Sequence, residues 1–434
     1  MKNIKYFILS LVILASCKDY TEGLNTDPNN FSSAAPELII GQAQLGWMQL
    51  AESNGARYAG IFMNQFSGED RQYLTVEAYS ITAGEFDDLW DDAYVEGITQ
   101  AKLTKRLALE DGNTQLAGVA QITEAVLFGE LAALFGDVPF NQASDADNNF
   151  APEYDSQASV FTAVQNLLDE AISNVGSVPA SLYAGNRMSS TATWAQIAHS
   201  LKARYYLLAK DYPNALTSAR RGIDSPTGSL VTLHGTSPEN RNLYYQFMVD
   251  EREGYLGATG SYLEQLIDLG NTSVNRLIST PGEAQRHAYY FTGTDPNTTS
   301  TGVFGQTQSF PLISYEEVKL IEAEAANRTG DTGDVTAFNE VRDALAAQYG
   351  GSFPHSTSSG NTLLREIIEE KYITLIGQLQ PFHDIRRTDN ILGVPAKTGT
   401  QIPQRFLYPQ VEVDNNPNTP NPLPGLFDAT PINQ

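Results

Sequence analysis

Two groups of carboxylates in this sequence could take part in catalysis or metal binding, because paired acids hydrolyse glycosides and clustered acids bind metal ions. One group has helical spacing with apolar residues between its members, which is typical of a solvated acidic face. Its members are Asp87, Asp88, Asp91 and Asp92. A second group, Asp145, Asp147 and Asn149, hints at calcium spacing but lacks the central glycine and closing glutamate of an EF-hand. We therefore expect no metal site and no cofactor.

Other catalytic signatures are missing from the sequence. It has no Gly-x-Ser-x-Gly elbow, no phosphate-binding glycine loop and no His-Glu-x-x-His helix. The histidines are scattered without ligand spacing, at positions 199, 234, 287, 355 and 383. Paired carboxylates for glycoside hydrolysis stay open, since they need only meet in space. We expect a protein that is not an enzyme.

Aromatic side chains offer a different chemistry, because the apolar face of a sugar can stack on a ring. Three consecutive aromatics at 289–291 are not expected to point into one core together, and a further tyrosine at 73 lies in a polar surround. Two polar neighbours of that tyrosine could bond to hydroxyl groups. The alternative is that these loop aromatics fold back as local anchors. The candidate ligand-binding residues are Asn64, Arg71, Tyr73, Tyr289, Tyr290 and Phe291.

Residues 1–16 have the pattern of a lipoprotein signal peptide. Lys2 and Lys5 precede an apolar run that is too short to span a bilayer as a stable helix. The sequence Leu14-Ala15-Ser16-Cys17 resembles a lipobox, in which the cysteine thiol receives a diacylglycerol. Cys17 is the only cysteine, so it cannot form an intramolecular disulfide. An ordinary secretory signal with an incidental cysteine is the alternative.

Residues 17–35 are predicted to be a lipidated, flexible tether. The segment is rich in Asn, Thr, Gly and Asp, and such a composition buries too little apolar surface to order itself. The pair Lys18-Asp19 resembles the signal that some bacterial groups use for export to the outer face of the outer membrane. We therefore expect a protein that a lipid anchor holds to the outer membrane, facing the cell exterior.

Composition narrows the possible partners. The chain has 434 residues, of which 41% are hydrophobic, enough for a large core. Its formal charge is −24, from 51 acidic and 27 basic residues. Because phosphate binding requires a basic surface, we expect no nucleic acid partner.

Helical periodicity dominates the chain after the tether and predicts a mainly α fold. Two hairpins, near 194–223 and 316–347, show tetratricopeptide-type spacing, with small residues where their helices touch. Between them lies a long, irregular segment near 225–309, and loops of this kind often carry binding surfaces. We predict a single α-helical domain over residues 36–434, with a tetratricopeptide-like scaffold and loop-rich insertions. Further helices are expected at 36–52, after a capping box at 82–85, at 115–135 and at 159–174.

The last quarter of the chain carries the most specific motifs. They are Glu369-Glu370-Lys371-Tyr372-Ile373, then Gln378, then Phe382-His383-Asp384-Ile385-Arg386-Arg387, then Ile402 to Pro409, and Asn415-Asn416-Pro417-Asn418. In this order they resemble the carboxyl-terminal signature of the SusD/RagB family of outer-membrane nutrient-binding lipoproteins. The lipobox, the segment Gly23 to Asn29, the helix from Phe86 to Ile98 and the hairpins agree with that family. The resemblance thus spans nearly the whole mature chain.

The resemblance implies a mechanism of capture. SusD-like proteins sit as lids on a SusC-like, TonB-dependent barrel, bind oligosaccharide or peptide, and pass it into the barrel. The family's binding aromatics cannot be transferred here, because no motif aligns them residue by residue. In this family context Asp384, Arg386 and Arg387 are expected to form buried ion pairs, with Glu370 or Glu412, rather than a catalytic cluster.

Four functional hypotheses remain open. The first is a non-catalytic surface lipoprotein that delivers oligosaccharide to a SusC-like transporter. The second is the peptide-binding lid of a RagAB-like importer. The third is a tetratricopeptide-type adaptor for a protein partner, which requires a continuous repeat array and a concave apolar groove. A lipid-anchored hydrolase is a further alternative, and it predicts polysaccharide turnover that depends on one or two acids.

Overall fold

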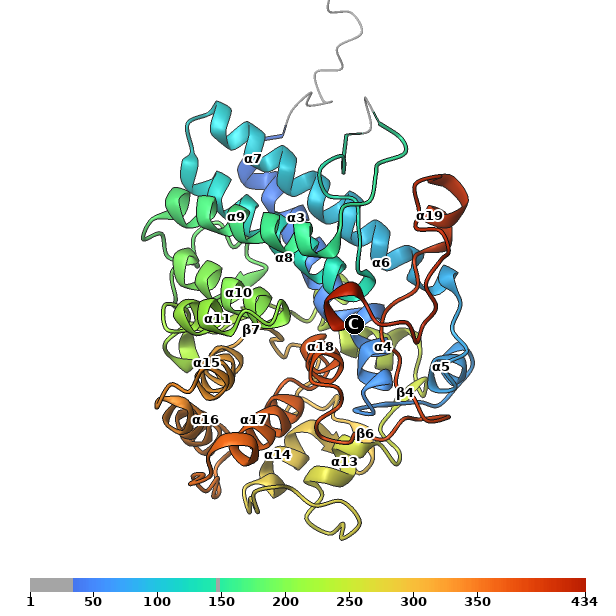
Figure 1. Ribbon diagram of the computed structural model, residues 1–434, viewed down its shortest axis with the longest axis vertical. Coiled ribbons are helices and arrows are strands. Elements are labelled where there is room, and N and C mark those ends of the chain that lie inside the picture. The colour runs from blue at the N-terminus through green and yellow to red at the C-terminus, as the bar shows by residue number, and fades with distance from the viewer. Residues whose placement is uncertain (1–33, 146–148) are drawn as a thin grey trace, which may run out of the picture.

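The computed structural model describes residues 34–145 and 149–434. Cys17, the predicted signal peptide and all but the end of the predicted tether lie outside the described residues, as does Asp147 of the calcium-like spacing. The described chain is mainly α-helical, as predicted, with short strands between the helices (Figure 1).

The elements have the following bounds. The α-helices are α3 (Pro36–Glu52), α4 (Asn54–Phe62), α5 (Gln72–Glu77), α6 (Asp87–Asp91), α7 (Gln100–Glu110), α8 (Thr114–Phe135), α9 (Gln157–Val175), α10 (Trp194–Leu208), α11 (Tyr212–Ala219), α12 (Leu243–Tyr245), α13 (Tyr262–Ile267), α14 (Glu283–Tyr290), α15 (Tyr315–Thr329), α16 (Asp334–Tyr349), α17 (Gly360–Thr374), α18 (Gln380–Arg387) and α19 (Gln410–Asn415). The 3-10 and π helices are η1 (Ala83–Phe86), η2 (Asp92–Thr99), η3 (Pro226–Gly228), η4 (Pro238–Asn240), η5 (Gln246–Glu251) and η6 (Pro431–Asn433). The strands are β1 (Ser67–Gly68), β2 (Met188–Ser189), β3 (Leu230–Thr232), β4 (Leu256–Gly257), β5 (Phe291–Thr292), β6 (Asp295–Pro296) and β7 (Pro311–Ile313).

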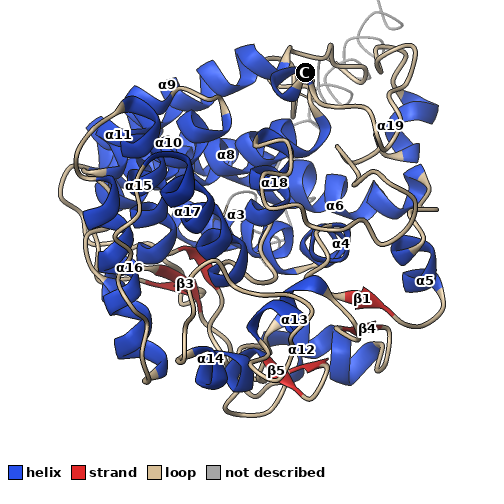
Figure 2. Ribbon diagram, turned by 60° about the horizontal axis from the view of Figure 1, so that its bottom comes forward, coloured by secondary structure: helices blue, strands red, loops and turns tan. Residues whose placement is uncertain are grey.

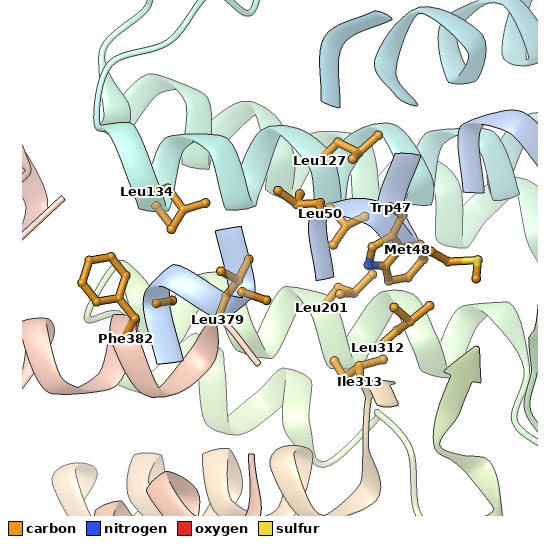
Figure 3. Packing of buried hydrophobic residues seen from close by; sticks show 14 of the residues in the cluster. Trp47, Met48, Leu50, Leu127, Leu134, Leu201, Leu312, Ile313, Leu379 and Phe382 are labelled. Carbon is orange, nitrogen blue, oxygen red and sulfur yellow. The ribbon is translucent and has the colours of Figure 1, made fainter. Parts of the chain in front are cut away.

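The first helix, α3, has the bounds that its periodicity predicts, and it packs against α7 and α8. Its side chains Trp47 and Leu50 lie in the core beside Leu127 of α8 and Leu201 of α10 (Figure 3). Full burial of a leucine side chain contributes about 1.5–3 kcal/mol to stability. The other tryptophans, Trp90 and Trp194, are also at most 6% exposed, so all three belong to the core.

The capping box predicted at Thr82 is present, with the Glu85 carboxylate accepting a hydrogen bond from the Thr82 backbone N–H at 2.9 Å. The helix after it differs from the single α-helix that the pattern predicts. It runs as η1, α6, the π-helix η2 and then α7. Here η2 crosses α3 so closely that a Cβ on Gly46 would lie 2.6 Å from the Cα of Gly97. Only a glycine at position 46 allows this crossing.

The long helix α8 is buried from Leu116 to its end. Within the described residues it is the one helix long and apolar enough to cross a membrane, and its whole apolar window is buried inside the protein. It packs against α7, α9 and α3. The hydroxyl of Tyr205 on α10 donates to the Val126 carbonyl of α8 at 3.0 Å. This helix is therefore the centre of the fold.

Both predicted hairpins are present, as α10–α11 and α15–α16, and the small residues at their contacts are buried. These are Ala203, Ala215, Ala323 and Ala337. The hairpins are far apart in sequence, yet α11 packs directly on α15. With α8 and α9 on one side and α17 on the other, they form one continuous stack of helices (Figure 1). The two hairpins, which a long segment separates in the sequence, are therefore neighbours in one continuous helical array in the folded protein.

The irregular segment between the hairpins carries short helices as well as loops. Its strand β3 pairs antiparallel with β2 and β7, while β4 pairs with β1 and β5 with β6. These small sheets lie on the side of the molecule away from α9 and α11 (Figure 2). They position the loops that border the candidate site.

The charged residues of the carboxyl-terminal motif form buried ion pairs, as the resemblance implies. Asp384 accepts a hydrogen bond from Arg387 Nε at 2.7 Å and lies 2.8 Å from Lys371 Nζ. Arg387 is also held by Glu324 of α15. Arg386 differs, because its guanidinium donates to backbone carbonyls rather than to a carboxylate. These side chains are structural.

The expected partners of that cluster are corrected by the structure. Glu370 binds three arginines elsewhere in the core, Arg276, Arg286 and Arg342. Glu412 accepts a hydrogen bond from the Tyr154 hydroxyl at 2.8 Å. The reason is geometric: neighbouring residues of a helix point in different directions, so Glu370 leaves α17 away from α18 while the next residue, Lys371, reaches Asp384.

Candidate functional site

The first group of predicted ligand residues packs into the protein. Tyr73 is 1% exposed, its hydroxyl accepts a hydrogen bond from Arg57 Nε at 2.8 Å, and its ring lies 4.9 Å from that of Phe247. The Asn64 side chain donates to the Pro395 carbonyl and accepts from the Tyr262 backbone N–H, both at 3.0 Å. Both residues are core residues here, with no face left for a ligand.

Arg71, the third member of that group, is exposed. Its guanidinium lies 3.6 Å from the carboxylate of Asp70 and within 5.8 Å of the Tyr255 ring. The structure therefore separates Arg71 from the buried Tyr73 and Asn64, and the three do not form a common site.

The three consecutive aromatics at 289–291 differ in burial, and the sequence does not predict this difference. Tyr290 and Phe291 are 1% and 2% exposed, so two adjacent rings do enter the core. They can do so because helix α14 ends at Tyr290 and the chain becomes extended at Phe291, which changes the direction of successive side chains. Tyr289 alone is half-buried. Of the six predicted ligand residues, Tyr289 and Tyr290 line one cavity, and the other four do not line it.

This cavity has a volume of about 480 Å³ and lies between α14, α16, the start of α15 and the chain before β7. We call it the tyrosine cavity. The half-buried rings of Tyr289 and Tyr349 lie side by side, with centroids 5.6 Å apart and ring planes at 50°. Phe310 and Tyr290 are the other aromatic residues of the lining. The arrangement offers flat apolar surface to a ligand, as sugar-binding sites do.

Amide side chains lie beside these rings. Gln308 Nε2 donates to the Tyr289 hydroxyl at 3.1 Å, and Gln348 is exposed at the rim. Gln378 is 4% exposed, and its Oε1 has no hydrogen-bond partner among the described residues. A buried acceptor without a partner costs about 1–3 kcal/mol, which a ligand hydroxyl would recover.

One carboxylate, Glu316, also lines the cavity, in the first turn of α15. Burial raises its pKa, against hydrogen bonds from its own backbone N–H and from the Ser314 hydroxyl that lower it. No cation contributes to this shift. Glu316 therefore brings a carboxyl group to the lining of the cavity, and such a group can bind hydroxyl or amine groups. Elsewhere in the described residues, no group of three or more His, Cys, Asp or Glu side chains could hold a metal ion.

Sequence reasoning finds Tyr289 but misses the residues that complete its surroundings. Tyr349 follows the predicted second hairpin directly and Glu316 opens it, so both read as scaffold. Gln378 belongs to the carboxyl-terminal signature, which does not specify a role for it. Nothing in a single sequence links Tyr289 to Tyr349, because the packing of α14 beside α16 brings them together. The sequence shows that amide and acidic residues are present at these positions, but it does not show that they come together around one cavity.

Comparison with known proteins gives one family match. A SusD-like family, described as "Starch-binding associating with outer membrane", matches residues 28–233. No curated protein matches the chain.

Solved structures match over most of the chain. A SusD/RagB family protein from Bacteroides thetaiotaomicron superposes with a TM-score of 0.65 at 21% identity, covering 89% of this chain and 95% of that one. A protein described as chitin-binding superposes with a TM-score of 0.65 at 19% identity, covering 88% and 94%. A SusD homologue from Bacteroides fragilis has a TM-score of 0.64 at 18% identity, covering 93% and 100%. The fold described above is thus shared with these proteins.

Proposed function

This chain is a SusD-like protein, and we propose that it is a non-catalytic lipoprotein which captures oligosaccharide at the cell surface and delivers it to a SusC-like, TonB-dependent transporter. The family description, starch binding in association with the outer membrane, supports the ligand class and the location. The chitin-binding structure of the same fold also favours a glycan.

The observation that carries this proposal is the tyrosine cavity. Its paired rings, Tyr289 and Tyr349, provide surface for an apolar sugar face. The unpartnered Oε1 of Gln378 and the carboxylate of Glu316 provide acceptors for sugar hydroxyls. Aromatic walls with a few converging polar groups are typical of ligand sites, and the volume of about 480 Å³ suits one or two sugar rings.

The same lining supports binding without catalysis. Glycoside hydrolysis commonly requires two carboxyl groups that flank the scissile bond. Among the described residues that line the tyrosine cavity, Glu316 is the one acid. A bound sugar would therefore be held and released unchanged.

Anchoring and domain organisation are part of the proposal. Cys17 would carry the lipid, residues 17–35 would form the tether, and residues 36–434 would form a single domain that includes both hairpins and the loop-rich segment. The adaptor function is disfavoured, although the helical stack is continuous. Helix α3 packs against α8 and helix α18 packs against α10, so these parts of the stack are already covered within the protein.

The test is affinity electrophoresis of the full chain against a panel of polysaccharides. Tyr289→Ala is the informative variant, because Tyr289 is half-buried and lines the cavity, whereas removing Tyr290 or Phe291 would damage the core. Tyr206→Ala is the matched control, since it removes a half-buried tyrosine outside the cavity. We expect one polymer to retard the wild type and the Tyr206→Ala variant, but not the Tyr289→Ala variant.

Equal retardation of all three proteins would place the glycan elsewhere. Retardation by no polymer would favour the peptide-binding alternative, which titration with mixed peptides would then test. Co-purification of a barrel with the full chain from its native membrane tests the transporter partner separately.

A further inference from the structure

A second cavity, of about 470 Å³, lies at the carboxyl end of α18. We call it the α18 cavity. It shares no lining residue with the tyrosine cavity, so a ligand bound in it would be independent of the function proposed above. Its lining includes three cations, Lys210, Arg386 and Arg387, and one acid, Asp389. This excess of positive charge is notable in a chain whose formal charge is −24.

Two of the three cations are not balanced by a carboxylate. Glu324 and Asp384 hold Arg387. In contrast, Lys210 Nζ donates to the Ile432 carbonyl at 2.8 Å, and Arg386 donates to the carbonyls of Gln404 and Ala133 at 2.9 and 3.0 Å. Neither forms an ion pair within residues 34–145 and 149–434.

The electrostatic surroundings agree with this imbalance. Burial and the neighbouring Arg405 together lower the pKa of Arg386 to about 9, against an opposite effect of Glu130. Burial also lowers the pKa of Lys210, and Arg387 and Arg328 act in the same direction. Both cations would gain from a bound anion, which would raise these pKa values.

The backbone at Lys210 shows that a lysine is held here at a conformational cost. Lys210 ends the first helix of its hairpin with φ +61°, a conformation that favours glycine. In the second hairpin the same turn position is occupied by Gly330, with φ +75°. A left-handed non-glycine residue costs about 1–2 kcal/mol. The first hairpin therefore keeps a charged side chain where its relative has the residue that the turn prefers.

The rest of the lining offers groups that complement a sugar. The Oδ1 atom of Asn433 has no hydrogen-bond partner among the described residues and can accept from a hydroxyl. Phe427 is 42% exposed and also lines a shallow cavity of about 300 Å³ next to this one, where its ring lies 6.1 Å from that of Tyr79. The α18 cavity thus combines cations, a free acceptor and an exposed ring.

We propose that the α18 cavity binds an acidic sugar, with its carboxylate on Lys210, a hydroxyl on Asn433 Oδ1 and its apolar face on Phe427. Charge-assisted hydrogen bonds of this kind are stronger than neutral ones, so the carboxylate is the main determinant. A neutral sugar of the same shape would bind much more weakly.

The test is calorimetric titration of the full chain with galacturonate, and with galactose as the neutral sugar of similar shape. We expect galacturonate to bind, its affinity to fall with added salt, and galactose not to bind at the same concentration. In Lys210→Gly, which installs the residue of the second hairpin, we expect at least a tenfold loss, or about 1.4 kcal/mol. Lys319→Met removes the same charge from an ion-paired lysine outside the cavity and should leave the affinity unchanged.

Several outcomes would overturn this site. They are no galacturonate binding by the wild type, equal affinity in Lys210→Gly, and an equal loss in Lys319→Met. Thermal melting of each variant shows whether it is folded, and Lys210→Met supplies a second test that keeps the turn free of glycine. Inorganic sulfate and phosphate form the last arm. If they compete as well as galacturonate does, the cavity recognises an oxyanion alone, and the sugar contacts assigned to Asn433 and Phe427 are wrong.

Discussion

The two hairpins have the same spacing of small residues, but their first helices, α10 and α15, contribute opposite charges to the core. The first, α10–α11, buries the cation Arg204, which is 3% exposed. The second, α15–α16, buries the anions Glu317 and Glu324, at 1% and 0%. Arg204 binds Glu317 through two hydrogen bonds of 2.7 Å, so these two buried charges neutralise each other across the contact between the hairpins. Repeated units of one shape are thus joined specifically by complementary charge.

The largest effect should come from breaking this connection. Arg204→Met leaves Glu317 and Glu130 buried without their cation, and loss of one member of a buried pair costs about 3–5 kcal/mol. Urea unfolding measures this loss. Arg220→Met is the matched control, because Arg220 joins the same hairpins through Asp331 at the surface, where an ion pair contributes about 0–1 kcal/mol. Equal losses in the two variants would contradict the role of burial.

The hairpins should also lose stability in different pH windows. Burial raises the pKa of Glu324, but Arg387, Lys371 and Arg328 outweigh it and lower the pKa to about 2. Its contribution is therefore complete above the unfolded value near 4.5 and is lost as the pH falls toward 2. Burial, with Arg221 and Lys202, lowers the pKa of His199 in the first hairpin to about 4. Its neutral form is favoured, so stability falls between about pH 6.5 and 4.

Thermal melting across pH separates these two windows. His199→Leu should flatten the stability profile between about pH 6.5 and 4 and leave the lower window unchanged. Glu324→Gln should do the reverse, with lower stability throughout because Arg387 loses its partner. Identical profiles in the two variants would show that neither group controls the acid response.

The smallest effects concern the two turns. Gly330→Ala meets no atom within 4 Å of the new Cβ, so only the left-handed backbone opposes it, at about 1 kcal/mol. Lys210→Gly removes the same strain but loses the hydrogen bond to the Ile432 carbonyl, and its stability should stay within about 1 kcal/mol of the wild type. Urea midpoints measure both changes. A large loss in Lys210→Gly would mean that the lysine is retained mainly to hold residues near Ile432.

The hairpins also show which properties a sequence can predict. Helix bounds follow from local periodicity, and α3 begins and ends at the predicted residues Pro36 and Glu52. The hairpins are local as well, and their alanine spacing predicts them correctly. The stacking of α11 on α15 is a long-range contact that no local pattern encodes.

The candidate site follows the same division. The residue type and the polar surroundings of Tyr289 identify it as a candidate ligand-binding residue. The sequence does not predict that Tyr290 and Phe291 both enter the core, because its pattern does not reveal the change from helix to strand at Phe291. The sequence predicts that the buried charged residues form ion pairs, but it does not predict which residues pair with each other. Glu370 and Lys371 are adjacent in the sequence, yet they belong to different ion-pair networks. The prediction of a ligand for Arg71 still awaits a test.

The composition of α8 has a consequence for biosynthesis. If the chain is exported as its signal peptide predicts, this apolar helix must pass through a translocation channel that can release such segments sideways into lipid. Glu124 lies near its middle, and a charged residue at that position opposes membrane insertion by about 2.5–3.5 kcal/mol. In the folded protein the same carboxylate is bound by Lys105 at 2.6 Å. In an exported chain, Glu124 would thus act at two stages, opposing insertion of α8 into the bilayer during secretion and pairing with Lys105 in the folded protein.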